Sequence, residues 1–166
     1  MIMDAMNRIM VAVGFNGYAE ELLTFAIRIA GGSSAELIIV NIIHSRDVEA
    51  VGTVAAMGYD VDSEHYVSSI KAERQQAFDQ ILKKNSYPTE KIRTIIKTGN
   101  PTEELLKLVL NENIDLIIMG IKGRTELRHM LVGSVAEKVF RRSPVPILSY
   151  RDEKNAERLR KYIHPK

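Results

Sequence analysis

The sequence predicts a single-domain α/β protein built on an open parallel sheet of five strands, with helices covering both faces. Short apolar runs alternate along the chain with segments whose apolar residues recur at helical spacing. The runs contain almost no polar residues, as expected for parallel strands buried on both faces. With 166 residues and 45% hydrophobic content, the chain suits one core. We therefore expect one domain over residues 1–150, followed by a charged tail over residues 151–166.

Each strand is predicted from its own apolar run. The second run is interrupted only by Asn41. In chain order, the predicted strands are Ile9–Val13, Leu37–Ile43, Ile92–Lys97, Leu116–Met119 and Val145–Ser149.

Four helices are predicted between these strands. The first begins near Ala19 and ends at Gly31 and Gly32, and the second runs from Ser63 to the region before Tyr87. The third begins after Asn100, whose side chain can cap it. The next residue, Pro101, suits the first turn of a helix. The fourth follows Gly133. The alternation predicts right-handed crossovers between parallel strands.

Two segments show no clear apolar period. Residues Ser45–Asp62 contain two glycines and scattered small apolar side chains, so we expect a long irregular loop. Residues Arg151–Lys166 hold six Lys or Arg against three Asp or Glu, with few apolar residues to bury. We expect this tail to form a marginal helix at best, and to contribute nothing to ligand binding.

Composition argues against several classes of function. Outside the tail the chain is close to neutral, with 17 basic and 18 acidic residues, which argues against nucleic-acid binding. There are no cysteines, so disulfides and thiol chemistry are excluded. Residues Met1–Arg8 do not resemble a signal peptide, and no apolar run has the length of a membrane span. We expect a cytoplasmic protein with no membrane partner.

The segment from Gly120 to Ser134 carries the clearest functional signal. It joins a predicted strand to a predicted helix, and glycines at 120, 123 and 133 allow close approach of a ligand to the backbone. A helix start after Gly133 favours an anion. The segment lacks both the dinucleotide fingerprint and the Walker loop. One alternative is purely structural, since Ser134 and Glu137 match a capping box.

The glycine spacing resembles that of the ATP-binding branch of the universal stress protein family. That spacing is Gly, two residues, Gly, nine residues, Gly, Ser, and it is complete here at Gly120, Gly123, Gly133 and Ser134. Similarity extends over most of Ile9–Tyr150. The resemblance implies a strand order of 3-2-1-4-5, homodimers formed through the C-terminal edge strand, and an adenine nucleotide between the ends of the first and fourth strands.

The resemblance also assigns site residues. It implies that the adenine pocket is lined by Ala12, Val13, Ile42 and Met119, and that ribose and phosphates contact Gly120, Gly123, Gly133, Ser134 and Val135. Among the loop cations Lys122, Arg124 and Arg128, we expect one to contact phosphate, and we select Arg124.

One departure from the family concerns Gly14. The family usually has an aspartate at this position, whose carboxylate contacts ribose or a bound metal. Asn16 offers a nearby hydrogen bond, and the Gly14–Gly17 segment is equally compatible with a plain turn. The sequence therefore leaves the affinity for nucleotide, and any role of magnesium or manganese, undecided.

No residues form a convincing catalytic set or a metal site. Glu126 is the one acid between the loop glycines, and the four histidines show no metal-ligand spacing.

Our main hypothesis is a homodimeric ATP-binding protein with a regulatory role in stress response, for which AMP and ADP are alternative ligands. A slow ATPase or phosphotransfer protein and a nucleotide-free interaction scaffold remain as alternatives. The protein partner and the pathway are not readable from the sequence.

Overall fold

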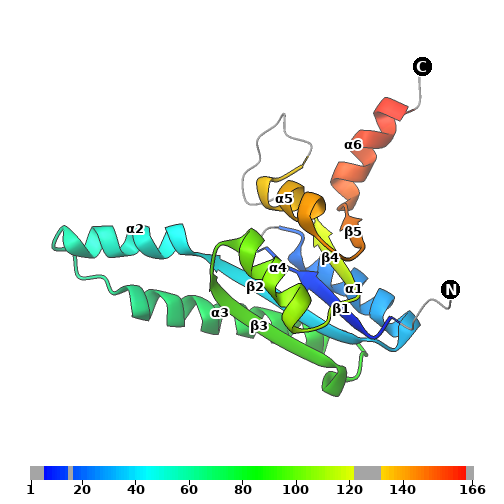
Figure 1. The fold of residues 1–166 in the computed structure, drawn as a ribbon, viewed down its shortest axis with the longest axis horizontal. Coiled ribbons are helices and arrows are strands. Elements are labelled where there is room, and N and C mark those ends of the chain that lie inside the picture. Colours follow the sequence, from blue (N-terminus) through cyan, green and yellow to red (C-terminus); the bar gives the residue numbers. More distant parts are fainter. Residues whose placement is uncertain (1–5, 15–16, 122–131, 164–166) are drawn as a thin grey trace.

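The structure, a computed structural model, describes residues 6–14, 17–121 and 132–163. Figure 1 shows one twisted sheet flanked by helices, from which a helical arm and the C-terminal helix extend. The strands are β1 (Arg8–Ala12), β2 (Glu36–His44), β3 (Ile92–Gly99), β4 (Leu116–Gly120) and β5 (Ile147–Tyr150). The helices are α1 (Ala19–Ser33), α2 (Ser45–Ala56), α3 (Ser63–Lys83), α4 (Pro101–Asn111), α5 (Ser134–Arg142) and α6 (Glu153–Ile163), with a short 3₁₀ turn at Thr89–Lys91.

The sheet has the order β3-β2-β1-β4-β5, and every neighbouring pair is parallel. The predicted fold class and strand order are therefore confirmed. All five predicted strands are present, with ends shifted by one or two residues. Strand β1 is central and pairs with β2 on one side and β4 on the other.

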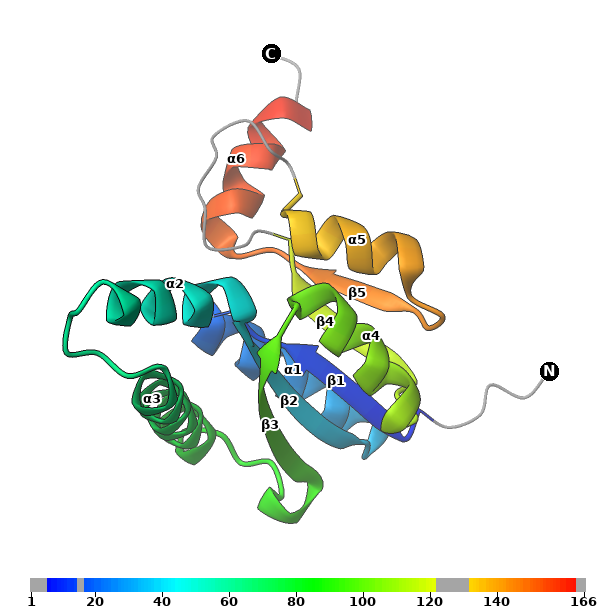
Figure 2. The same cartoon turned by 60° about the vertical axis from the view of Figure 1, so that its left-hand side comes forward.

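The two faces of the sheet carry separate apolar layers. Helices α1 and α3 cover one face, where Leu23 of α1 and Phe78 of α3 are fully buried. Helices α4 and α5 cover the other face with residues such as Leu108 and Val139. Alternate side chains of β1 enter opposite layers, because successive residues of a strand point to opposite faces. The two views in Figures 1 and 2 show the same pairs of helices on each side.

The prediction of an irregular loop over Ser45–Asp62 is wrong for most of this segment. Helix α2 occupies Ser45–Ala56, and its first turn is capped by the His44 side chain, which accepts from the Arg46 amide at 3.2 Å. None of its residues is buried. Together with the first part of α3 it forms the arm that extends from the sheet in Figures 1 and 2. The half-buried residues Val48, Val51 and Ala55 recur at helical spacing, so the sequence did contain a helical period, which the small side chains and Gly52 obscured.

The charged tail, for which the sequence allowed a marginal helix, is helical in the structure. Helix α6 spans Glu153–Ile163, and its start is held by Asp152, whose Oδ1 accepts from the Asn155 amide at 3.0 Å. Figure 2 shows this helix projecting beside the β4–α5 end of the sheet. Local capping, which an apolar count does not register, therefore contributes to this helix.

No helix in the described part of the chain is long and apolar enough to cross a membrane.

Candidate functional site

Strand β1 ends before its neighbours do, and this leaves an opening at the carboxyl edge of the sheet. Its last residue, Ala12, pairs with Val40 of β2 and Met119 of β4. From there the chain turns into α1 on one face, whereas β4 leads to α5 on the other face. Ligands of open α/β sheets bind at such a reversal of strand order, outside the carboxyl ends of the strands.

A cavity of about 440 Å³ occupies this position. Its volume lies in the range of roughly 300–1,000 Å³ that small-molecule sites usually have. The structure brings the predicted site residues that it describes together around this cavity, namely Ala12, Val13, Gly14, Ile42, Met119, Gly120, Gly133, Ser134 and Val135. Gly123 and Arg124 lie outside the described residues, as do Lys122, Glu126 and Arg128.

The amino end of α5 forms one wall of the cavity. The Gly133 amide donates to the Ile121 carbonyl at 2.6 Å, so the two ends of the connecting segment are held together. The first helical bond runs from the Glu137 amide to the Gly133 carbonyl at 2.9 Å. The amides of Ser134 and Val135 precede it and have no partner within the helix, as is usual for a first turn. They are available to an anion.

The capping-box interpretation of Ser134 is wrong. Gly133 is the N-cap residue, with φ −69° and ψ 151°, and the cap has no side-chain hydrogen bond. Ser134 is the first helical residue and is exposed at the cavity. Because residues of every kind adopt the backbone angles of Gly133, the glycine is not required for the fold of this turn.

Tyr18 lines the cavity and packs directly on Gly120. A Cβ atom added at Gly120 would lie 2.3 Å from the Tyr18 hydroxyl oxygen and 2.6 Å from ring carbon Cε2. The tyrosine ring therefore fills the space that any other side chain at the end of β4 would occupy. The sequence analysis did not predict Tyr18, because an aromatic residue beside a turn has no distinctive spacing.

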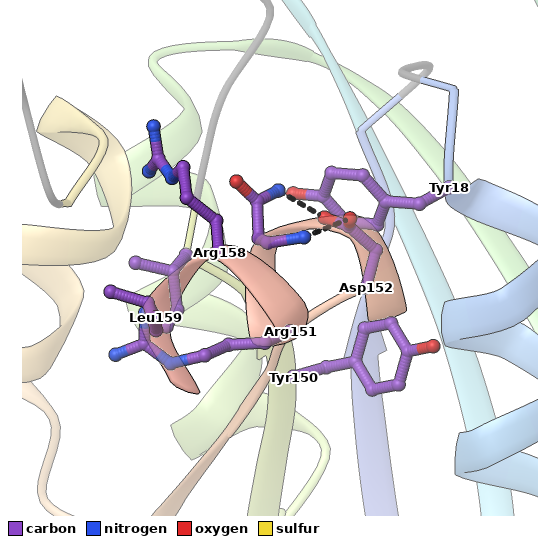
Figure 3. Close-up of a pocket in the computed structure, with 8 residues that line it drawn as sticks. Tyr18, Tyr150, Arg151, Asp152, Arg158 and Leu159 are labelled. Carbon is purple, nitrogen blue, oxygen red and sulfur yellow. Dashed lines mark hydrogen bonds between the residues drawn. The ribbon is translucent and has the colours of Figure 1, made fainter. Parts of the chain in front are cut away.

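A second cavity lies on the other side of Tyr18, against α6 (Figure 3). Tyr150 of β5 borders it, with a ring centroid 6.4 Å from that of Tyr18, and Arg158 and Leu159 of α6 complete the rim. Burial and the nearby Glu21 carboxylate raise the pKa of Tyr150. This cavity measures about 20 Å³, which is room for about one water molecule. A nucleotide-sized ligand therefore fits only the larger of these two cavities.

Two further walls of the larger cavity were not predicted. One is the start of α2, where Arg46 and Asp47 line the opening. The other is a buried pair formed by Asn41 of β2 and Arg74 of α3. Arg74 occupies a position on the apolar stripe of its helix, four residues after Ile70 and four before Phe78. A single arginine at such spacing is the signal that could have identified it.

Asp115, which the sequence places before β4, lies at the opposite edge of the sheet. Its Oδ2 accepts from the amides of Asn7 and Arg8 at 2.8 and 2.9 Å. It therefore fixes the amino end of β1 and is remote from the cavity. Within the described ranges, no group of three or more His, Asp or Glu residues is arranged to hold a metal ion.

The fold and the cavity define a single-domain α/β protein with a candidate ligand site where the strand order reverses. The sequence profile of the Universal stress protein family matches residues 6–151. The chain belongs to this family.

Two relatives show the extent of the similarity. Universal stress protein MJ0577 of Methanocaldococcus jannaschii is 28% identical over 150 residues, which cover 86% of this chain and 93% of the relative. Universal stress protein YxiE of Bacillus subtilis is 28% identical over 149 residues, covering 87% and 99%. The solved structure of MJ0577 superimposes with a TM-score of 0.72 at 25% identity, covering 90% of this chain and 98% of that one.

We predict that Gly120→Ala destabilises the protein, because the new methyl group displaces the Tyr18 ring. Overpacking in a well-packed core costs about 1–3 kcal/mol, and the loss here should lie at the low end because the displaced atoms are the tip of the half-buried Tyr18 side chain. Tyr18→Ala in the same chain removes the clash, so the double variant should lose less stability than the two single variants together. Urea unfolding measures all three. Gly32→Ala is the control, because a Cβ there meets nothing within 4 Å. Additive losses would show that Tyr18 and Gly120 are not in contact.

Proposed function

We propose that this protein binds ATP in the cavity at the carboxyl edge of β1 and β4, and that it acts as a homodimeric regulator of the stress response in the cytoplasm. The observation that carries the proposal is the composition of the cavity wall. Apolar residues at the ends of β1, β2 and β4 face the free amides at the start of α5 across one space of about 440 Å³. An apolar base and an anionic phosphate group require these two surfaces in one site.

The choice of an adenine nucleotide is supported by two proteins of the same fold. A universal stress protein has been solved in complex with cAMP, and it matches with a TM-score of 0.61 at 22% identity. A universal stress protein from Archaeoglobus fulgidus has been solved in complex with dAMP, with a TM-score of 0.59 at 17% identity. We favour ATP over AMP and ADP because the glycine spacing resembles that of the ATP-binding branch of the family, which implies ribose and phosphate contacts at Gly120, Gly123, Gly133 and Ser134.

In this proposal binding is the function, and hydrolysis is the alternative. A slow ATPase needs an acid near the terminal phosphate to hold a metal or to orient water. Phosphate release by the purified protein, measured against a Gly133→Val variant, distinguishes the two. A nucleotide-free scaffold is favoured by Gly14, which brings no carboxylate to the end of β1. Mass analysis of nucleotides that copurify with the gently isolated protein tests that alternative.

We predict that Gly133→Val abolishes ATP binding and leaves the fold intact. Its backbone angles suit valine, so the added side chain affects mainly the space in front of α5. A ligand at 100 times its dissociation constant stabilises the folded protein by about 2.7 kcal/mol. The stabilisation should appear as an ATP-induced rise in the melting temperature of the parent protein, and the rise should be absent in the variant. Gly32→Val in α1 is the matched control, and an unchanged shift in Gly133→Val would place the phosphates elsewhere.

We predict that Gly14→Asp tightens ATP binding, and more so with magnesium or manganese. Gly14 is exposed at the cavity, where a carboxylate can accept from ribose or help to hold a metal. One hydrogen bond to a charged group contributes about 1.5–3 kcal/mol, which is roughly tenfold in affinity or more. Calorimetric titration with and without the metal measures the gain.

The control for this prediction is Gly14→Asn, which has the same shape without the charge. Its affinity should not depend on the metal. Equal or weaker ATP binding by a Gly14→Asp protein that melts normally would show that the missing carboxylate is not what limits affinity.

The proposed dimer forms through the edge strand β5. This strand pairs with β4 on one side, and the Pro146 carbonyl accepts from the Ile117 amide at 3.0 Å. Because backbone groups alternate in direction along a strand, the amides of Ile147 and Ser149 face the outer edge. An unpaired edge is a liability unless another chain or a cover protects it.

We therefore predict that Ser149→Pro converts the dimer into a monomer, because it removes one outward amide and keeps the bonds to β4. Sedimentation at micromolar concentration should give a dimer for the parent protein and for Ser149→Ala. A parent protein that sediments as a monomer, or a Ser149→Pro protein that stays dimeric, contradicts the proposed interface.

A further inference from the structure

Asn41 and Arg74 form a polar pair beneath the floor of the cavity. Their exposed fractions are 3% and 5%, and both side chains lie between the sheet and α3. Arg74 Nη1 donates to Asn41 Oδ1, and Asn41 Nδ2 donates to the Val13 carbonyl at 2.6 Å. The pair thus connects the middle of α3 to the last residues of β1.

Arg74 and the Val13 carbonyl together determine which way the Asn41 amide faces, since one can only donate and the other can only accept. A guanidinium group can only donate, so the carbonyl oxygen of Asn41 must be turned toward it. The Asn41 amide nitrogen is then turned toward Val13. Without Arg74, the Asn41 oxygen would lose this buried donor, and the side chain that holds the Val13 carbonyl would be less firmly fixed.

The bond to Val13 lies at the point where β1 leaves the sheet. The Val13 amide still donates to the Val40 carbonyl at 2.9 Å. The β1–β2 pairing ends at Ala12, while β2 stays paired with β3 as far as His44. A side chain therefore holds the Val13 carbonyl beyond the end of the regular pairing, and it sets the path of Val13 and Gly14 along the cavity.

We infer that Asn41 and Arg74 are positioning residues of the candidate site, which hold the end of β1 in the form that receives the base and ribose. This inference rests on the proposed ATP binding. It assigns the pair to the base end of the ligand, since both residues line the cavity from the α3 side of the sheet. The phosphate end is formed separately by Gly133 and Ser134.

Calorimetric titration of Arg74→Met, Asn41→Leu and the double variant with ATP tests this. Each single variant should weaken binding by roughly tenfold. The double variant should bind no more weakly than Asn41→Leu alone, because Arg74 acts through Asn41. Arg74→Lys retains a donor and should recover part of the affinity. Asn41→Asp keeps an acceptor for Arg74 but sets an oxygen against the Val13 carbonyl, so it should bind as weakly as Asn41→Leu.

The variant Phe78→Leu is the control that distinguishes an effect of lost core packing from an effect of lost positioning. Phe78 is fully buried one turn after Arg74 on the same helix. This control should lower the melting temperature and leave the ATP affinity of the folded protein unchanged. An NMR titration with adenosine, which has no phosphate, distinguishes variants that affect the base end of the site from variants that affect the phosphate end. The Arg74→Met loss should persist with adenosine, whereas Gly133→Val should bind adenosine as the parent protein does.

The outcomes distinguish this inference from the proposed function. If the parent protein binds neither ATP nor adenosine, the proposed function fails and this inference fails with it. If the parent protein binds ATP, and Arg74→Met and Asn41→Leu bind it equally well, the positioning role is wrong and the site stands. If Phe78→Leu loses as much affinity as Arg74→Met, the pair contributes only to stability.

Discussion

The short central strand β1 is the constraint on which the rest of the structure depends. It has parallel partners on both sides and helices over both faces, so its residues after Arg8 are apolar and its backbone is paired with both neighbours. The chain leaves it through α1 on one face, whereas α5, which follows the neighbouring strand β4, lies on the other face. Because β2 and β4 extend beyond Ala12, the opening at their ends follows from the length of β1. The cavity is thus a consequence of strand length and strand order.

Much of this architecture could be predicted, because burial on two faces leaves a clear sequence pattern. Runs such as Leu37–Ile43 have the length and composition of a covered strand, and the connections between them are of helical length. The failures occurred where structure does not depend on burial. Helix α2 has no buried residue, and α6 starts from a local cap at Asp152. In both helices the apolar residues recur at helical spacing, but they are few or small, so the pattern is weak beside that of a buried helix.

Part of the candidate site could also be predicted, because its glycines form a pattern that can be read in the sequence. Glycines at fixed spacing are visible in a sequence, and Gly120 and Gly133 do border the cavity. The structure shows that a glycine is present at these two positions for different reasons. At Gly120 the space for a side chain is filled by Tyr18, whereas Gly133 has ordinary backbone angles and lines the open cavity. Contacts such as that of Tyr18 with Gly120 join distant parts of the chain, and spacing does not show them.

The buried Arg74 is the feature that stability explains least. Removing a cation from water costs several kcal/mol in effective terms, and its position on the apolar stripe of α3 would accept methionine or leucine at similar volume. Replacing a buried ionic group with an apolar one is often neutral or stabilising. What an apolar residue cannot do is orient the Asn41 amide, which holds the Val13 carbonyl beyond the end of regular pairing. The arginine therefore has a geometric role at the end of β1, which an apolar residue of the same volume would not fulfil.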